Sequence, residues 1–300
     1  MQSISVSIID FNGRENTIDC LKSISESSKD DFELNAVVIN NFPQKKLDLP
    51  AFSNLKIKII ENEKNLGFAG GQNVGIKYAL ANGADYILVL NNDTVIDKNL
   101  VSELIKAANS GIGIIAPKIY FAKGFEYHKD RYKKEDLGKV FWFAGGKMDW
   151  NNVIGHHRGV DDVDHGQYDK EEEIDFASGC AMLVGREVFE KAGLFDGKYF
   201  LYYEDNDLCQ RVRKTGFKIM YSPKAFMWHK NAGSVGGSGS SLQDYYITRN
   251  RMLFGMKYAP LRSKLSLIRE SLNLLLSGRP WQKKGIGDFY LGRLGKGSYE

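Results

Sequence analysis

Three acidic side chains, Glu204, Asp205 and Asp207, stand close together between an aromatic run and an amphipathic segment. Neighbouring carboxylates repel one another, so a fold that keeps them beside aromatic residues indicates a use for their charge. A helix is predicted over Asp207–Lys214, and its dipole would keep the Asp205 carboxylate ionised at the helix N-terminus. An ionised carboxylate there suits general-base catalysis. The alternative is an ordinary acidic helix cap.

Two further polar groups follow predicted strands. Asp93 closes the motif Asn91-Asn92-Asp93, and His229 follows the apolar run Phe226–Trp228. A carboxylate at Asp93, with an amide oxygen from Asn91, is suited to a hard divalent cation such as Mg²⁺ or Mn²⁺. The alternatives are an Asn/Asp turn after a strand and a histidine in a loop.

The segment Asn65–Gly75 is rich in glycine and runs into a predicted helix. Glycine allows the backbone to approach a ligand or a neighbouring strand, and a glycine-rich turn before a helix resembles a phosphate cradle. The segment matches neither the P-loop motif nor a strand-borne G-x-G-x-x-G, which disfavours an ATPase or a dinucleotide-binding protein. A turn fixed by packing is the alternative.

Strands and helices alternate along the first part of the chain. The predicted strands are Val6–Asp10, Leu34–Ile39, Lys56–Ile60, Tyr86–Leu90 and Ile112–Ala116, and the predicted helices are Arg14–Ser25, Ile76–Ala81 and Leu100–Ala108. This order predicts an α/β fold with a doubly wound parallel sheet. Ligands bind at the carboxyl ends of such strands, where Asp10, Asn40 and Asp93 lie.

Residues 121–173 differ in character, with many charged residues and isolated aromatic rings. We expect short strands and loops that form part of an acceptor cleft. The pair His156-His157 lacks the helical spacing of a metal site, so a surface loop is predicted for it.

Composition is that of a globular enzyme of 300 residues, with three unpaired cysteines that fit a reducing compartment. Neither a signal peptide at Met1–Ile9 nor a membrane-spanning segment is expected. Residues 257–296 carry nine basic and two acidic side chains interleaved with leucines. This pattern favours an amphipathic helix over nucleic-acid binding, either against an anionic membrane or with a solvated basic face.

Six segments carry a resemblance to a known family: Val6–Gly13, NLGFAGGQNVGI, LNNDT, SGCAML, GLFDGKYFLYYEDNDLCQR and Pro223–His229. In order and spacing they resemble the inverting glycosyltransferases of family 2, within it the bacterial rhamnosyltransferase-like branch that builds surface polysaccharides. The similarity covers about residues 5–234, and YYITRNR and GIGDFYLGRLGK are similar to that branch's tail. It implies a GT-A-type, mostly parallel sheet flanked by helices, with a donor half over residues 1–120, an acceptor half over 121–240, and a helical basic extension over 241–300.

The resemblance also implies roles for individual residues. Asp205 is the expected catalytic base, and the neighbouring Glu204 is expected to belong to the same catalytic site. Asp93 and His229 are the expected ligands of Mg²⁺ or Mn²⁺. The donor, a dTDP- or UDP-sugar, is expected to contact a set of mostly polar and glycine residues: Asp10, Asn12, Asn40, Asn65, Gly67, Gly70, Gly71, Asn73, Asn91, Asn92 and Arg249.

Two positions depart from the family pattern. Asn40 stands where an aspartate usually accepts from the nucleobase, and an uncharged amide makes a weaker hydrogen bond. Asn91 replaces the first aspartate of the metal-binding motif, which leaves Asp93 as its one formal anion.

The expected reaction is inverting transfer of a rhamnose-like or other hexose to a glycan or polyprenyl-linked acceptor. The expected location is the cytoplasm, in peripheral contact with the inner face of the cell membrane. Two alternatives are a sugar nucleotidyltransferase, disfavoured because Phe11–Asn16 is not a basic Gly-rich loop, and a non-catalytic nucleotide- or glycan-binding module.

Overall fold

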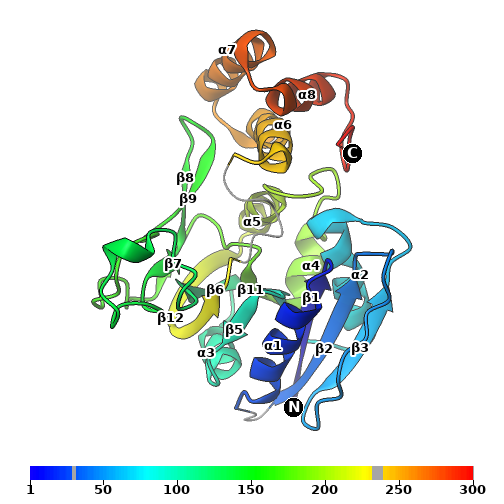
Figure 1. Ribbon diagram of the computed structural model, residues 1–300, viewed down its shortest axis with the longest axis vertical. Coiled ribbons are helices and arrows are strands. Elements are labelled where there is room, and N and C mark those ends of the chain that lie inside the picture. Colours follow the sequence, from blue (N-terminus) through cyan, green and yellow to red (C-terminus); the bar gives the residue numbers. More distant parts are fainter. Residues whose placement is uncertain (29–31, 232–238, 300) are drawn as a thin grey trace.

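A computed structural model describes residues 1–28, 32–231 and 239–299 of the protein (Figure 1). Its strands are β1 (Gln2–Asp10), β2 (Phe32–Asn40), β3 (Lys56–Glu61), β4 (Tyr86–Asn91), β5 (Thr94–Ile96), β6 (Ile112–Phe121), β7 (Phe141–Phe143), β8 (Gly146–Asp149), β9 (Ile154–His157), β10 (Glu172–Glu173), β11 (Ala181–Gly185) and β12 (Lys218–His229). Its helices are α1 (Arg14–Ser25), α2 (Gly67–Ala81), α3 (Leu100–Ala107), the 3₁₀ turn η1 (Lys129–Arg131), α4 (Arg186–Ala192), α5 (Glu204–Lys214), α6 (Ser241–Tyr258), α7 (Leu261–Ser277) and α8 (Pro280–Tyr290).

One large sheet forms the centre of the molecule. Among the described residues its main path runs β10-β12-β6-β11-β4-β1-β2-β3, with β5 paired to β12 and β7 paired to β6. The strands β1 to β4 are parallel, with α1 crossing back between β1 and β2 and α2 between β3 and β4. The β6–β12 pair is also parallel. β11 enters antiparallel between β4 and β6. The expected α/β class is therefore confirmed, but the sheet is mixed rather than parallel throughout.

Close packing of α2 on the sheet explains two of its glycines. A Cβ on Gly71 would meet the Ile9 side chain at 2.8 Å, and one on Gly75 would meet Ser7 Oγ at 2.2 Å. Only glycine therefore allows this helix to approach β1 so closely. Ile4, Val6 and Ile8, which alternate with Ser7 and Ile9 along β1 and so lie on its other face, are fully buried.

The three C-terminal helices gather at one end of the molecule, and the N-terminus lies at the opposite end (Figure 1). Helix α6 is anchored by aromatic side chains: Tyr245 and Tyr246 are fully buried, and the Phe254 ring stacks on Trp150 at 5.9 Å. None of the helices in the described residues combines the length and apolar character needed to cross a membrane.

Candidate active site

Asp93 and His229 meet because β5 and β12 pair in antiparallel register, with His229 opposite Thr94. His229 Nε2 lies 3.1 Å from Asp93 Oδ1. Burial alone would lower the pKa of His229, but the nearby Cys180 sulfur and the Asp93 carboxylate outweigh burial and raise that pKa to about 10. The other ring nitrogen, Nδ1, is buried without a hydrogen-bond partner.

The segment Ser178–Cys180 connects this pair to the acidic cluster. The Cys180 sulfur interacts electrostatically with His229, and the Cys180 carbonyl accepts from the Asn91 amide at 2.9 Å. One residue earlier, the Gly179 amide donates to Asp205 Oδ2 at 3.0 Å. The strand-end aspartate, the late histidine and the acidic cluster therefore converge on two consecutive residues, Gly179 and Cys180. The sequence SGC carried this signal only as part of the family resemblance.

Asp205 lies in the first turn of α5, one residue after the helix begins at Glu204. Burial raises the pKa of Asp205 above its ordinary value, while the amides of Gly179 and Asn206 favour its ionised form. Burial and the charge of Asp205 raise the pKa of Glu204 well above the usual range. Glu204 Oε2 is buried and has no partner. The two carboxyl groups therefore differ: the more accessible Asp205 is held by hydrogen bonds, and Glu204 favours its neutral form.

Asp207 has a structural task. It is fully buried, and its carboxylate accepts from Lys257 at 2.7 Å, Tyr258 at 2.8 Å and Arg211 at 2.8 Å. Burial opposes the charge, but these donors outweigh it and lower the pKa of Asp207. Asp207 thereby ties α5 to the end of α6.

The turn before α5 is strained. Phe200, Tyr202 and Tyr203 all adopt positive φ angles, at 65°, 69° and 70°, which bulky side chains rarely do. Asn250 of α6 holds this turn by donating to the carbonyls of Tyr199, Leu201 and Tyr202 at 2.7–2.9 Å.

Arg249 corrects one prediction. Its guanidinium is fully buried near the rings of Tyr245 and Tyr246 and donates to the Tyr199 carbonyl at 3.0 Å. A side chain committed to backbone carbonyls cannot also reach a diphosphate, so Arg249 supports the turn before the catalytic helix and does not contact the donor. The spacing of YYITRNR does not reveal which way a helical side chain points.

The glycine-rich segment also differs from the expected phosphate cradle. Gly67 (φ 70°) passes so close to the Phe200 carbonyl that a Cβ would lie 2.4 Å from it, and a Cβ on Gly70 would meet Leu66 at 2.8 Å. With Gly71 already committed to packing on β1, these glycines serve close contacts within the protein. Asn73 exchanges two hydrogen bonds with the backbone of Phe195 and is likewise committed.

Asn41, which sequence reasoning assigned no separate role, organises the start of α2. Its amide nitrogen donates to Asn65 Oδ1 and to the Gly67 carbonyl, both at 3.0 Å, and its oxygen accepts from the Leu66 amide at 3.0 Å. Asn65, which was predicted to contact the sugar donor, is therefore hydrogen-bonded to Asn41 within the protein.

Thr17 joins Asp10 and Asn92, which lie at the carboxyl ends of β1 and β4. Thr17 Oγ1 donates to Asp10 Oδ2 at 2.6 Å and accepts from Asn92 Nδ2 at 2.9 Å. Asn12 is exposed beside them with a positive φ of 56°, and Asn91 ends β4. This edge remains the expected location of the donor.

Asn40 is buried and engaged within the protein. It donates to the Lys45 carbonyl at 2.7 Å and to Glu61 Oε2 at 2.6 Å, and its oxygen accepts from the Phe42 amide at 3.0 Å. The Asn40 oxygen keeps a second lone pair, but the residue is only 1% exposed, so in this arrangement a nucleobase does not reach it. Glu61, an exposed carboxylate that sequence reasoning missed, stands next to it.

An aromatic group borders the histidine. The Trp142 ring lies 4.4 Å from His157 and 4.6 Å from His229, between centroids. Burial lowers the pKa of His157 to about 4. His157 therefore packs as a neutral ring beside the site, and the surface loop predicted for it is wrong.

Asp93 and His229 supply part of a ligand set for a divalent cation. Asp93 supplies a carboxylate oxygen and His229 an imidazole nitrogen, and ions such as Mn²⁺ complete such a set with substrate phosphate oxygens. The unpartnered Nδ1 leaves the imidazole with an unused nitrogen. No cluster of three or more His, Cys, Asp or Glu suited to a metal occurs in the described part of the chain. A cation held here would therefore depend on the diphosphate for most of its ligands.

An open polar hollow of about 590 Å³ lies elsewhere, near α3 and β12, and is lined by side chains that include Asp97, Lys118 and Asp164.

Comparisons with known proteins show the family of the chain. The profile described as glycosyl transferase family 2 matches residues 5–193. The low-salt glycan biosynthesis hexosyltransferase Agl10 of Haloferax volcanii is 26% identical over 255 residues, which cover 84% of this chain and 75% of that protein. The dTDP-rhamnosyl transferase RfbF of Shigella flexneri is 26% identical over 216 residues, covering 69% of this chain and 66% of that protein.

A solved structure shows the same fold. The structure of GalNAc-T7 with UDP, GalNAc and Mn²⁺ superposes with a TM-score of 0.60 at 16% identity; the match covers 91% of this chain and 55% of that longer chain. The GT-A-type fold expected from the sequence is thereby confirmed.

Proposed function

Because the chain belongs to glycosyl transferase family 2 and is a glycosyltransferase that uses a nucleotide-sugar donor, we propose that it transfers rhamnose or another hexose with inversion. The donor is a dTDP- or UDP-sugar, and the acceptor is a hydroxyl of a glycan or polyprenyl-linked glycan in cell-surface polysaccharide synthesis. The names of the hexosyl- and rhamnosyltransferase relatives support this choice of donor and product. The division into a transferase domain over residues 1–240 and a helical extension over 241–300 stays a prediction.

One observation supports the proposal most strongly: Asp205, Asp93 and His229 converge on Gly179 and Cys180. Inverting transfer needs a base on one side of the anomeric carbon and charge neutralisation for the leaving diphosphate on the other. Asp205 is suited to the first task because its pKa is raised by burial while it stays accessible.

The step is a single displacement. The acceptor oxygen forms a bond to the anomeric carbon as the bond from that carbon to the diphosphate oxygen breaks, and the hydroxyl proton passes to Asp205. Asp93 and His229 would hold Mg²⁺ or Mn²⁺, which when bound neutralises charge on the diphosphate as a Lewis acid. Burial and the charge of Asp205 raise the pKa of Glu204, so Glu204 favours its neutral form. The negative charge beside the reacting hydroxyl is then that of Asp205 alone.

A donor panel tests the proposal. The purified chain is incubated with Mn²⁺, a glycan acceptor and dTDP-rhamnose, UDP-glucose, UDP-N-acetylglucosamine or GDP-mannose, and nucleoside diphosphate release and the anomeric configuration of the product are measured. We expect transfer from a dTDP- or UDP-sugar with inverted configuration, lost in Asp205→Asn. Retained configuration, or full activity in Asp205→Asn, would refute the mechanism.

A further inference from the structure

Helix α7 carries its large apolar side chains on the side exposed to solvent. Leu261, Leu265, Leu272 and Leu276 are 72%, 60%, 54% and 81% exposed. Isolated exposed leucines are ordinary on protein surfaces, but a contiguous apolar stripe marks an interaction site.

The spacing places these leucines on one face. At about 100° per residue, Leu261, Leu265, Leu272, Leu275 and Leu276 fall within an arc of about 100°. We call this arc the leucine face; Leu275 is the least exposed of its members, at 37%.

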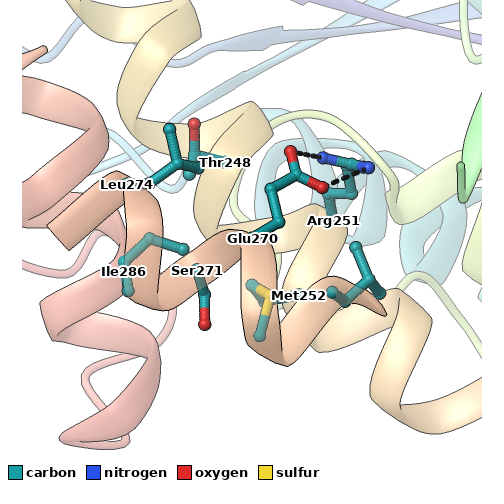
Figure 2. Close-up of a pocket in the computed structure, with 8 residues that line it drawn as sticks. Thr248, Arg251, Met252, Glu270, Ser271, Leu274 and Ile286 are labelled. Carbon is teal, nitrogen blue, oxygen red and sulfur yellow. Dashed lines mark hydrogen bonds and ion pairs between the residues drawn. The ribbon is translucent and has the colours of Figure 1, made fainter. Parts of the chain in front are cut away.

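The other side of α7 packs on the protein. Ser263, Leu267 and Ser271 are buried there. Figure 2 shows Ser271, Leu274 and Glu270 turned towards α6 and α8, where they line a cavity of about 10 Å³, room for roughly one water molecule. The leucine face is therefore not the side with which α7 joins the fold.

Basic residues border the leucine face on both edges. By helical position Arg262 and Arg269 lie along one edge, and Lys264 lies along the other. Within Leu261–Ser277 the one acidic side chain is Glu270, which is turned inward and forms a two-pronged ion pair with Arg251 at 2.6 and 3.0 Å (Figure 2). The outer surface of the helix is thus apolar at its centre and cationic at both edges.

We propose that the leucine face docks α7 lengthwise onto the surface of an anionic lipid bilayer. Leucines at the centre enter the boundary between headgroups and acyl chains, and the arginines and lysine at the edges contact acidic headgroups. Charge favours this partner over a second copy of the chain. Both edges are basic, so pairing two leucine faces would set like charges side by side.

The position of α7 in the fold agrees with this role. Strand β1 starts at the N-terminal end and runs towards the end where α6, α7 and α8 gather (Figure 1). Helix α6, which packs against α7, also holds the turn that leads into Asp205 through Asn250. A docked α7 would therefore keep the candidate active site close to the bilayer, although the docking itself does not depend on which sugar is transferred.

Vesicle binding tests the proposal. The full chain is sedimented with phosphatidylcholine vesicles that contain or lack phosphatidylglycerol. We expect binding to the anionic vesicles that weakens as salt rises, and at least about a tenfold loss in the exposed double variant Leu265→Gln/Leu272→Gln. Val160→Gln, which removes an exposed apolar side chain outside the three helices, is the matched control and should bind like the parent chain.

Two results would overturn the docking. One is equal vesicle binding by the parent chain and the double variant. The other is a parent chain that does not bind vesicles and sediments as a dimer in ultracentrifugation, while the double variant sediments as a monomer. That result would assign the leucine face to self-association. Transfer to a soluble acceptor, measured in parallel, separates this outcome from failure of the proposed activity.

Discussion

The backbone amide of Gly179 donates a 3.0 Å hydrogen bond to the Asp205 carboxylate. The next residue, Cys180, contacts His229 through its side chain and Asn91 through its carbonyl. Three rigid connections therefore pass through one short segment at the start of β11. Because that strand is inserted between β4 and β6, the position of the base relative to Asp93 is set by the centre of the sheet rather than by a surface loop.

The two neighbouring carboxyl groups should respond differently to amide substitution. Asp205→Asn removes the proton acceptor and should lower kcat about 10²–10⁴-fold. Glu204→Gln imitates the neutral carboxyl that burial favours, so its kcat should stay within about tenfold of the parent value. Steady-state kinetics with a saturating donor compare the two variants. An equal or larger loss in Glu204→Gln would assign the base to Glu204.

The acid side of the pH–rate profile follows from the same group. Burial raises the pKa of Asp205 above its ordinary 3.8, so the ionised base is lost as pH falls through that raised value. We expect kcat/KM to decline towards acid pH with the protonation of Asp205, and the residual rate of Asp205→Asn to lack this decline. An unchanged acid limb in that variant would show that another group controls it.

Removing a metal ligand should raise the concentration of Mn²⁺ that the enzyme requires. Asp93→Ala and His229→Ala each remove one of the two protein ligands that we propose, so both should raise the Mn²⁺ concentration needed for half-maximal activity at least about tenfold. Exposed His128→Ala is a matched control that should leave that concentration unchanged. If both variants reach half-maximal activity at the parent's Mn²⁺ concentration while a chelator still abolishes activity, the cation is bound by other residues.

Much of the central fold was predictable because buried strands and amphipathic helices leave periodic patterns. Helix α1 spans the predicted Arg14–Ser25, and the five predicted strands lie within β1, β2, β3, β4 and β6. The antiparallel entry of β11 was not predicted, since an apolar run of five residues carries no mark of its direction.

The residues of the candidate site were likewise predictable only in part. Asp93 and His229 were recognisable because polar residues at strand ends collect at one edge of a sheet. The roles of Gly71, Asn40 and Arg249 were not, because each depends on which atoms stand opposite after folding. The same reason hides the role of Asn250, although it lies in the motif YYITRNR.

Asn250 should act as a positioning residue for the base. Its amide holds three carbonyls of the strained turn before α5, so Asn250→Ala leaves buried acceptors unpaired and should cost about 1–3 kcal/mol of unfolding free energy. It should also lower kcat while leaving the donor KM nearly unchanged, because the turn leads into Asp205 and not to the donor edge. Exposed Asn273→Ala is the matched control for both measurements. A loss of stability with normal kcat in the folded fraction would reduce Asn250 to a packing role.

Asp207 should control stability at acid pH. Its pKa is lowered in the folded protein by Lys257 and Arg211, so the stabilisation it supplies is present above the unfolded value near 4 and is lost as pH falls through the lowered folded value. Because Arg211 and Lys257 are partly exposed, Asp207→Asn should cost roughly 3 kcal/mol at neutral pH, the lower end for a broken buried pair. Urea unfolding at pH 7 and at pH 3 should show the gap between parent and variant narrowing at the lower pH, whereas exposed Asp130→Asn should show little gap at either. A gap independent of pH would mean that the Asp207 side chain stabilises through packing and neutral hydrogen bonds rather than through its charge.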